Sequence, residues 1–235
     1  MAEYADVAAE LGVADELEVP SQDFEGGGGD LINEDVTALH DAWVTESVSP
    51  ELLPFKRDVV EDMTALIENQ EAELEKLQAQ DADQAWSASL YTQDLDRIKF
   101  ALARYLRARL AKIESCAWKY QAGDADFLAK LSDAEEQYAR GYVKLLSRHY
   151  DETVLNQLPS EFQAFPGSGA GAAENDPFSP DLNTYVFCRV KEDGGGAEVQ
   201  LDEDTGAHVT LDPESIHVLR YPPVKALVGS ELELI

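Results

Sequence analysis

The sequence is poor in basic residues and in cysteine. Its 18 Lys and Arg stand against 47 Asp and Glu, and the formal net charge is −29. A surface this acidic repels phosphate backbones and favours cationic partners, so we expect no autonomous DNA binding by the whole chain. The two cysteines, Cys116 and Cys188, are far apart and form no C-x-x-C pair. Neither a zinc motif nor a disulfide framework is therefore indicated.

Long apolar runs and catalytic motifs are missing as well. No run of about eighteen apolar residues occurs, and the N-terminus is acidic where a secretory or mitochondrial signal is basic, so we expect a soluble intracellular protein. The sequence contains no G-x-x-x-x-G-K-[ST], H-E-x-x-H or G-x-S-x-G pattern, and its four histidines define no triad. These absences point away from an enzyme, and we expect no catalytic residue, cofactor or metal site.

The first 55 residues contain many carboxylates and no Lys or Arg, and the run E-G-G-G-G-D at positions 25–30 is a flexible break. We expect residues 1–29 to form an acidic disordered tail. A second interpretation is a docking peptide that folds against a partner groove. Asp6, Val7 and Leu11 would then supply an acid and two apolar side chains on one side of a short helix.

Apolar residues recur at helical spacing from position 30 onward, which predicts a helical domain over residues 30–158. Ser49 and Pro50 have the residue types of a helix start, and a long helix should follow them. Ser132 and Glu135 form a capping-box pattern that opens a later helix. In that helix His149 shares the apolar face, and we interpret it as a core histidine rather than a metal ligand.

Residues 159–180 mix Gly, Ala, Ser and Pro without any period, which predicts a flexible linker. Short β-type runs separated by Gly- and Asp-rich turns then fill residues 181–235. The predicted fold class is therefore α+β, an N-terminal helical bundle followed by a small β-rich domain. A β module this small needs to pack against another surface to be stable. Within it we expect four large side chains to pack: Tyr185, Phe187, Leu219 and Tyr221.

The most basic stretch of the chain, DLDRIKFALARYLRARLAKIE, begins at Asp94. At 100° per residue its apolar side chains form one continuous arc that includes Tyr105. Arg97, Arg104 and Arg107 lie on the opposite side, and Lys112 lies near the boundary. Arg109 falls in or beside the apolar arc, where an unpaired charge is costly. We therefore expect Arg109 to pair with an acid from a neighbouring helix or subunit.

The outer arginines leave three interpretations open: a solvated face, a protein interface or a nucleic-acid contact. The acidic balance of the chain disfavours the last of these. As a hypothesis, the subunit interface or buried ion pair comprises Arg97, Arg104, Tyr105, Arg107, Arg109 and Lys112.

Four segments together resemble the Sld-five family of subunits of GINS, the four-subunit complex of eukaryotic DNA replication. They are WVTESVSPELLPFKRDVVEDM, DLDRIKFALARYLRARLAKIE, DLNTYVFCRV and IHVLRYPPVKALVGSELELI. The resemblance implies a helical A domain and a small β-rich B domain in a heterotetramer with three related subunits. It also implies a nuclear, non-catalytic scaffold that joins the MCM ring to a RecJ-like partner in the replicative helicase and helps connect it to DNA polymerases.

For the acidic tail, the resemblance implies docking to a trimeric WD-repeat adaptor of the replisome, with Asp6, Val7 and Leu11 in the docking peptide. Two other classes of function remain in competition with the scaffold. One is a stand-alone nucleic-acid-binding protein that uses the basic helix over residues 97–112, and it predicts strongly salt-dependent binding. The other is an unrelated enzyme with an acidic site, which predicts converging carboxylates in a pocket.

Overall fold

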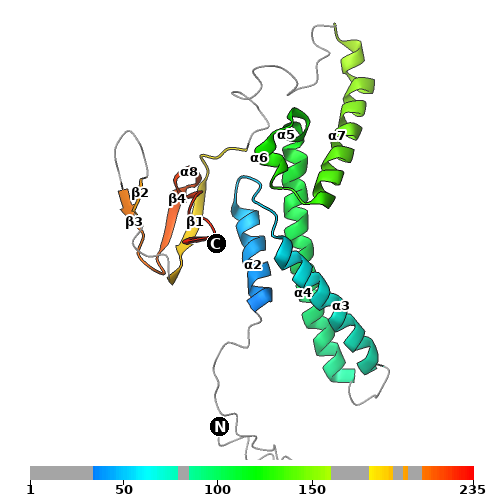
Figure 1. The fold of residues 1–235 in the computed structure, drawn as a ribbon, viewed down its shortest axis with the longest axis vertical. Coiled ribbons are helices and arrows are strands. Elements are labelled where there is room, and N and C mark those ends of the chain that lie inside the picture. The colour runs from blue at the N-terminus through cyan, green and yellow to red at the C-terminus, as the bar shows by residue number, and fades with distance from the viewer. Residues whose placement is uncertain (1–33, 79–84, 160–179, 193–197, 201–207) are drawn as a thin grey trace, which may run out of the picture. The chain divides into compact units, whose positions relative to one another are not determined.

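Helices occupy the first part of the structure and strands the last part (Figure 1). The computed structural model describes residues 34–78, 85–159, 180–192, 198–200 and 208–235. The tail, its docking peptide and most of the expected linker lie outside the described residues. The helical elements are α2 (Glu34–Val48), α3 (Arg57–Gln78), α4 (Ala85–Ser115), α5 (Ala117–Ala122), α6 (Ala125–Leu128), α7 (Asp133–Thr153) and the 3-10 turn η2 (Leu155–Gln157).

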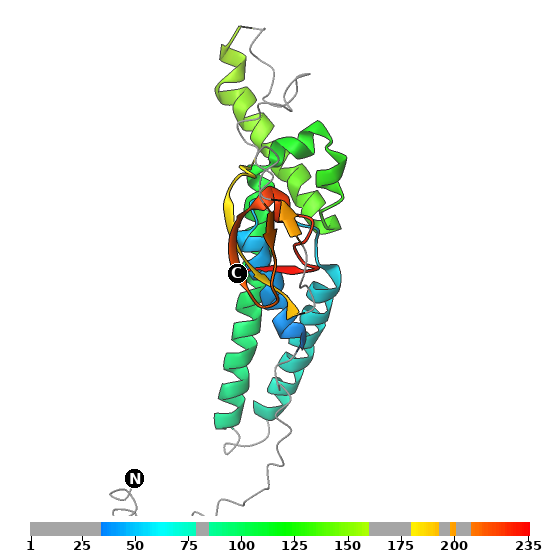
Figure 2. The ribbon, with the colours of Figure 1, turned by 90° about the vertical axis from the view of Figure 1, so that its left-hand side faces the viewer.

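Helices α2, α3 and α4 share one apolar core. Leu39, Met63 and Tyr105 are its fully buried members, one from each helix, and partly buried apolar side chains surround them. Figure 2 shows α3 running alongside α4, and a second cluster of Leu74, Ala88 and Leu95 joins these two helices further along. The helical spacing of apolar residues in the sequence thus produces one buried stripe on each helix.

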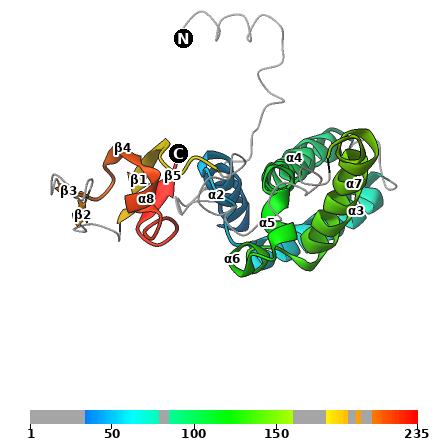
Figure 3. The same cartoon turned by 90° about the horizontal axis from the view of Figure 1, so that it is seen from above.

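The C-terminal end of α4 leads into a second helical core. The helix stops at Ser115, and Cys116 has non-helical dihedral angles before α5 begins. Ile113 and Cys116 pack there with Phe127 of α6 and Ala139 of α7. Figure 3 shows this group of helices from above. The capping box that opens α7 is confirmed, because Ser132 accepts from the Glu135 N–H while Glu135 accepts from the Ser132 N–H.

The expected helix start at Ser49 is wrong. Helix α2 ends at Val48, residues 52–56 have no helical structure, and α3 begins only at Arg57. Pro54 disfavours a helical conformation at Leu53, the residue before it. The Ser49 hydroxyl donates to the Glu51 carbonyl at 3.0 Å and caps no helix.

His149 is also not a core histidine: it is exposed on α7. Leu145, four residues earlier, is 69% exposed. The apolar spacing of α7 is real, but no described residue covers this part of the helix. Helical periodicity marks a face that can be buried, and it does not reveal whether the same chain buries it.

The strands form two small antiparallel sheets. In the first, the order is β4 (Ile216–Arg220), β1 (Tyr185–Val190) and β5 (Leu232–Leu234); β2 (Glu198–Gln200) pairs with β3 (His208–Thr210) in the second. A short helix, α8 (Tyr221–Val224), follows β4 directly. The expected strands are therefore present, and the predicted α+β class is confirmed.

The β-rich part has one core. Of the four side chains expected to pack there, two lie inside it and two lie outside. Leu219 and Tyr221 lie inside it with Val186, Cys188 and other apolar residues. Tyr185 and Phe187, in contrast, point away from the core and are 64% and 55% exposed, so the expectation that they pack there is wrong. Side chains alternate between the two faces of a strand, and β1 places its odd-numbered residues outside.

Candidate protein interface

Arg109 of α4 lies at the centre of a buried polar network and is 0% exposed. Its Nε donates to Glu135 Oε1 at 2.7 Å and its Nη2 to Glu135 Oε2 at 3.0 Å. Its Nη1 donates to Glu46 Oε2 at 3.0 Å and to the Leu53 carbonyl at 2.7 Å, while Nη2 also reaches the Lys130 carbonyl at 2.9 Å. All five N–H donors of the guanidinium are thus used.

Two carboxylates and two rings hold this guanidinium in place. The rings of Phe55 and Tyr105 lie 5.3 and 5.8 Å from its central carbon, close enough for cation–π attraction. Burial by itself lowers the pKa of Arg109, but the hydrogen bonds and charge of Glu135 and the charge of Glu46 raise it above its ordinary value. Arg109 therefore remains a cation and joins α2, α4 and α7.

Lys112 extends the network by one turn. Its Nζ donates to Glu46 Oε1 at 2.8 Å, to the Glu51 carbonyl at 2.8 Å and to the Glu46 carbonyl. Burial lowers the pKa of Lys112 and outweighs the opposing effect of the Glu46 carboxylate. Together Arg109 and Lys112 offset the charge of Glu46, which is almost fully buried.

The basic residues of α4 thus form two groups with different surroundings. Arg109, Lys112 and the buried Tyr105 belong to contacts within this chain, as does Lys99, which pairs with Glu71 of α3 at 2.6 Å. Arg97, Arg104 and Arg107, in contrast, are exposed. Arg97 is 85% exposed and lies 3.7 Å from Asp94 on the next turn, a geometry that contributes little in water. Only the exposed group can contact another molecule.

Large apolar side chains lie in the same line as these exposed arginines. At 100° per residue, Trp86, Leu90 and Phe100 project within about 40° of Arg104. Trp86 is 74% exposed, and Arg104 stacks over the Phe100 ring at 5.0 Å. We call this line the α4 outer stripe: Trp86, Leu90, Arg97, Phe100, Arg104 and Arg107.

The α4 outer stripe has the composition of a protein interface. It runs for about 30 Å along the helix, and no Asp or Glu between positions 86 and 115 lies within roughly 60° of its centre. Trp and Arg are the residues that contribute most at interface centres, and exposed apolar side chains in a row mark a surface to be covered. Sequence reasoning found its arginines and missed its apolar members, which a helical projection extended to Trp86 would have included.

A second polar cluster connects the helical part to the β-rich part. The Glu51 carboxylate accepts from Lys130 at 2.9 Å, from Tyr221 at 2.9 Å and from Lys225 at 2.7 Å. Burial tends to raise the pKa of Glu51, but the hydrogen bonds from Lys225, Lys130 and Tyr221 outweigh it and lower the pKa. Val48 adds an apolar contact to the β-rich core. These contacts supply the surface that the small module needs.

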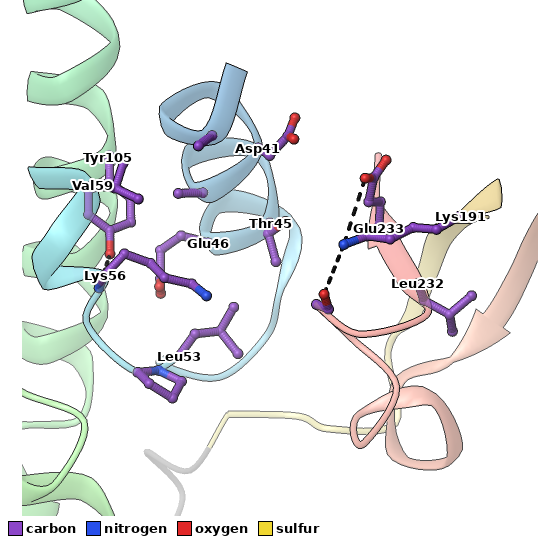
Figure 4. Close-up of a pocket in the computed structure, with 14 residues that line it drawn as sticks. Asp41, Thr45, Glu46, Leu53, Lys56, Val59, Tyr105, Lys191, Leu232 and Glu233 are labelled. Atoms are coloured by element: carbon purple, nitrogen blue, oxygen red, sulfur yellow. Dashed lines mark hydrogen bonds and ion pairs between the residues drawn. The ribbon is translucent and has the colours of Figure 1, made fainter. Parts of the chain in front are cut away.

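A cleft of about 190 Å³ lies beside this connection, between α2, the 53–56 segment and β5 (Figure 4). Its charged lining is mixed, with Asp41, Glu46 and Glu233 against Lys56 and Lys191. Ligand pockets usually measure about 300–1,000 Å³ and present converging polar groups of matched chemistry. The cleft is smaller than that, and Lys191 already donates to the Gly229 carbonyl at 2.8 Å.

The described residues also bear on two other classes of site. They contain no group of three or more His, Cys, Asp or Glu side chains arranged to hold a metal ion. Within the same residues, no helix is long and apolar enough to cross a bilayer. The feature that stands out for function in the described structure is thus the α4 outer stripe.

Comparison with protein families relates both parts of the chain to one complex. Residues 63–154 match the helical bundle domain of GINS complex proteins, and residues 180–235 match the C-terminus of the DNA replication complex GINS protein SLD5. The helical-bundle match precedes the C-terminal match along the chain, just as the helical part precedes the β-rich part.

Curated relatives extend over most of the chain. A protein from Arabidopsis thaliana named DNA replication complex GINS protein SLD5 is 31% identical over 218 residues, which cover 89% of this chain and 97% of the relative. The Bos taurus protein of that name is 30% identical over 227 residues, with 93% and 97% covered. The Dictyostelium discoideum protein is 29% identical over 202 residues, with 84% and 90% covered.

Proposed function

Because the chain belongs to the SLD5 family of GINS subunits, we propose that it is a non-catalytic structural subunit of the GINS heterotetramer. In this role it acts in the nucleus and assembles with the three other GINS subunits. The complex serves as a scaffold of the MCM-containing replicative helicase, with a RecJ-like partner and links to DNA polymerases. The helicase needs this scaffold for the initiation and the elongation of DNA replication.

The observation that carries the proposal is the α4 outer stripe. A helix that exposes Trp86 and Phe100 beside exposed arginines has lower free energy when a partner with apolar and acidic groups covers it. The stripe belongs to the part of the chain that matches the GINS helical bundle. We therefore assign it to the contact with another GINS subunit.

Domain roles complete the proposal. Residues 1–29 form the acidic tail, and its peptide around Asp6, Val7 and Leu11 docks a trimeric WD-repeat adaptor. Residues 30–158 form the A domain, residues 159–180 the linker and residues 181–235 the B domain. Deletion of residues 1–29 should abolish adaptor binding without affecting tetramer assembly, and unchanged adaptor binding would contradict the role of the tail.

Native mass spectrometry after co-expression with the three other GINS subunits tests the assembly. We expect a 1:1:1:1 complex for the wild type and a strong loss of that complex for the double variant Phe100→Asp, Arg104→Glu. The control Arg148→Glu makes on exposed α7 the same charge reversal as Arg104→Glu makes on α4, and it should assemble normally.

A stable monomer that ignores the other subunits would overturn the scaffold function. Tight, salt-dependent DNA binding by that monomer, lost in Arg104→Glu, would instead support the stand-alone nucleic-acid-binding function.

A further inference from the structure

The contact between the helical part and the β-rich part contains little apolar surface. The β-rich core has ten buried residues, and all of them lie between positions 186 and 234. Val48 of α2 packs against this core from the helical side and is only partly buried. The β-rich part therefore has a core of its own. We call the contact the seam: Val48, Ser49 and Glu51 on the helical side, and Tyr221 and Lys225 on the β-rich side.

The polar contacts of the seam converge on one carboxylate. Tyr221 donates to Glu51 Oε1 at 2.9 Å, and Lys225 Nζ lies 2.7 Å from the same oxygen and 2.9 Å from Oε2. The hydroxyls of Ser49 and Tyr221 lie 3.3 Å apart. Lys225 brings the positive charge to this group from the β-rich part, and its side chain is 49% exposed. The attraction between the two parts thus depends on an ion pair that solvent can reach.

Packing beside the seam is incomplete. The cleft of about 190 Å³ lies between α2 and β5, as Figure 4 shows. Carboxylates line it from both parts, with Asp41 and Glu46 on α2 and Glu233 on β5. Lys191 makes its contacts within the β-rich part, with Glu233 at 4.0 Å and with the Gly229 carbonyl at 2.8 Å. No continuous close-packed core therefore joins the two parts here.

Separation at the seam would leave no buried charge without a partner. Glu51 and Lys130 both belong to the helical part and would stay paired at 2.9 Å. Lys112 would still donate to the Glu51 carbonyl. The acceptors of Arg109 also lie in the helical part, so its network would remain complete. Breaking a buried ion pair is strongly destabilising when it leaves one charge behind, and the half-exposed Lys225 would instead become solvated.

We propose that the seam is a charge-dependent latch: the β-rich part undocks from the helical part as a folded body when Lys225 loses its contact with Glu51. Small, polar contacts between two folded parts permit relative motion. A partner that binds the surface uncovered on either side would shift the chain to the undocked state. The latch goes beyond the proposed function, and every contact behind it lies within this chain.

The competing possibility is that the β-rich part unfolds whenever it leaves the helical surface. Its small size favours that outcome. The strand pairing favours release as a folded body, because β1 pairs with β4 on one side and with β5 on the other. Neither partner strand belongs to the helical part, so undocking removes no strand from the sheet.

Double electron–electron resonance between two spin labels tests the latch in the full chain. The labels are attached through Gln93→Cys on α4 and Arg189→Cys on β1, which are exposed positions, whereas the native Cys116 and Cys188 are buried. We expect one narrow distance distribution when the seam is intact. Lys225→Glu should raise the fraction of chains outside that distribution at least about fivefold, because repulsion replaces a charge-assisted hydrogen bond.

Three further variants separate charge from other effects. Glu51→Gln removes the carboxylate and should raise the same fraction. Lys225→Arg keeps the cation and should retain the narrow distribution. Lys144→Glu makes the same charge reversal as Lys225→Glu at an exposed position of α7, away from the seam, and should behave like the wild type.

Hydrogen exchange decides whether the released β-rich part stays folded. The latch predicts that amides paired between β1 and β4 keep their wild-type protection in Lys225→Glu and in Glu51→Gln. Loss of that protection in both variants would mean unfolding and would overturn the proposal. The proposal also fails if neither variant changes the distance distribution, if Lys225→Arg opens the seam as far as Lys225→Glu, or if the wild type has no dominant distance.

Discussion

Arg109 and Glu135 meet through two parallel hydrogen bonds, Nε to Oε1 at 2.7 Å and Nη2 to Oε2 at 3.0 Å. The same Glu135 carboxylate accepts the Ser132 N–H at 2.9 Å and so completes the capping box of α7. One carboxylate therefore caps a helix and neutralises a buried cation on another helix. Because both side chains are almost fully buried, removal of Arg109 leaves Glu135 without its cation, and removal of Glu135 leaves Arg109 with Glu46 as its one carboxylate partner among the described residues.

Arg109→Ala should lower the free energy of unfolding by about 3–5 kcal/mol, because it leaves Glu46 and Glu135 buried without their shared cation. Urea denaturation monitored by circular dichroism measures the change. The control Arg107→Ala, on the exposed side of the same helix, should stay within about 0.5 kcal/mol of the wild type. Similar stabilities for the two variants would show that the network contributes no net stability.

Ser132→Ala should cost about 1 kcal/mol, since the Glu135 N–H loses its side-chain acceptor at the start of α7. Ser132→Thr keeps a hydroxyl oxygen at that position and should recover most of the loss. Thermal melts of the two variants beside the wild type decide the matter. A threonine variant as unstable as the alanine variant would argue that packing, and not the cap, is responsible.

Glu51 should make the stability of the folded chain depend on pH in the acidic range. Its pKa is lowered from 4.5 in the folded chain, so protons bind the unfolded state first as the pH falls. Its contribution is fully present above pH 4.5 and is lost as the pH falls through the folded pKa. Glu51→Gln should therefore flatten the decline of melting temperature below pH 4.5, whereas Glu61→Gln on the exposed side of α3 should leave that decline unchanged.

Tyr221→Phe should cost about 1 kcal/mol, because the buried hydroxyl donates to Glu51 Oε1 at 2.9 Å and lies 3.3 Å from the Ser49 hydroxyl. Tyr185→Phe is the matched control, since its exposed hydroxyl should matter little. Chemical denaturation of both variants gives the comparison. If the two changes cost the same, the contact between Glu51 and Tyr221 has no special role in stability.

Local patterns predicted a large part of the fold. The serine and glutamate at the start of α7 satisfy each other through atoms three residues apart, so a short window of sequence contains the whole capping box. The helical projection placed Arg109 towards the apolar side of α4 because an arc of 100° per residue needs only the helix itself. The strands were found in the same way, from short runs between turn residues.

Contacts between residues far apart in the sequence could not be predicted from local patterns. With 47 acidic residues in the chain, no pattern singles out Glu46 and Glu135 as the partners of Arg109. The sequence around Ser49 has the residue types of a helix start, but Glu51 instead binds Lys130, Tyr221 and Lys225, which are far away in the sequence. Local propensity was overridden there by tertiary contacts.

The predictions that certain exposed side chains are buried were wrong for a different reason. Tyr185 and Phe187 alternate with buried residues of β1, so the pattern of a strand was right while the choice of the inner face was wrong. Both faces of that strand are apolar, and alternation cannot then decide which one the chain buries. His149 on α7 repeats the problem for a helix.

All five N–H donors of the Arg109 guanidinium have acceptors, and the ribosome makes these acceptors at different times. Helix α4 leaves the ribosome before Lys130 and Glu135, which supply three of its acceptor atoms. Glu135 follows Arg109 by 26 residues, and at 5–20 residues per second this interval lasts about 1–5 s. During that time a nascent chain can pair Arg109 with Glu46 and the Leu53 carbonyl, which are already made. The other three N–H donors of the guanidinium gain their acceptors in this chain when Lys130 and Glu135 emerge.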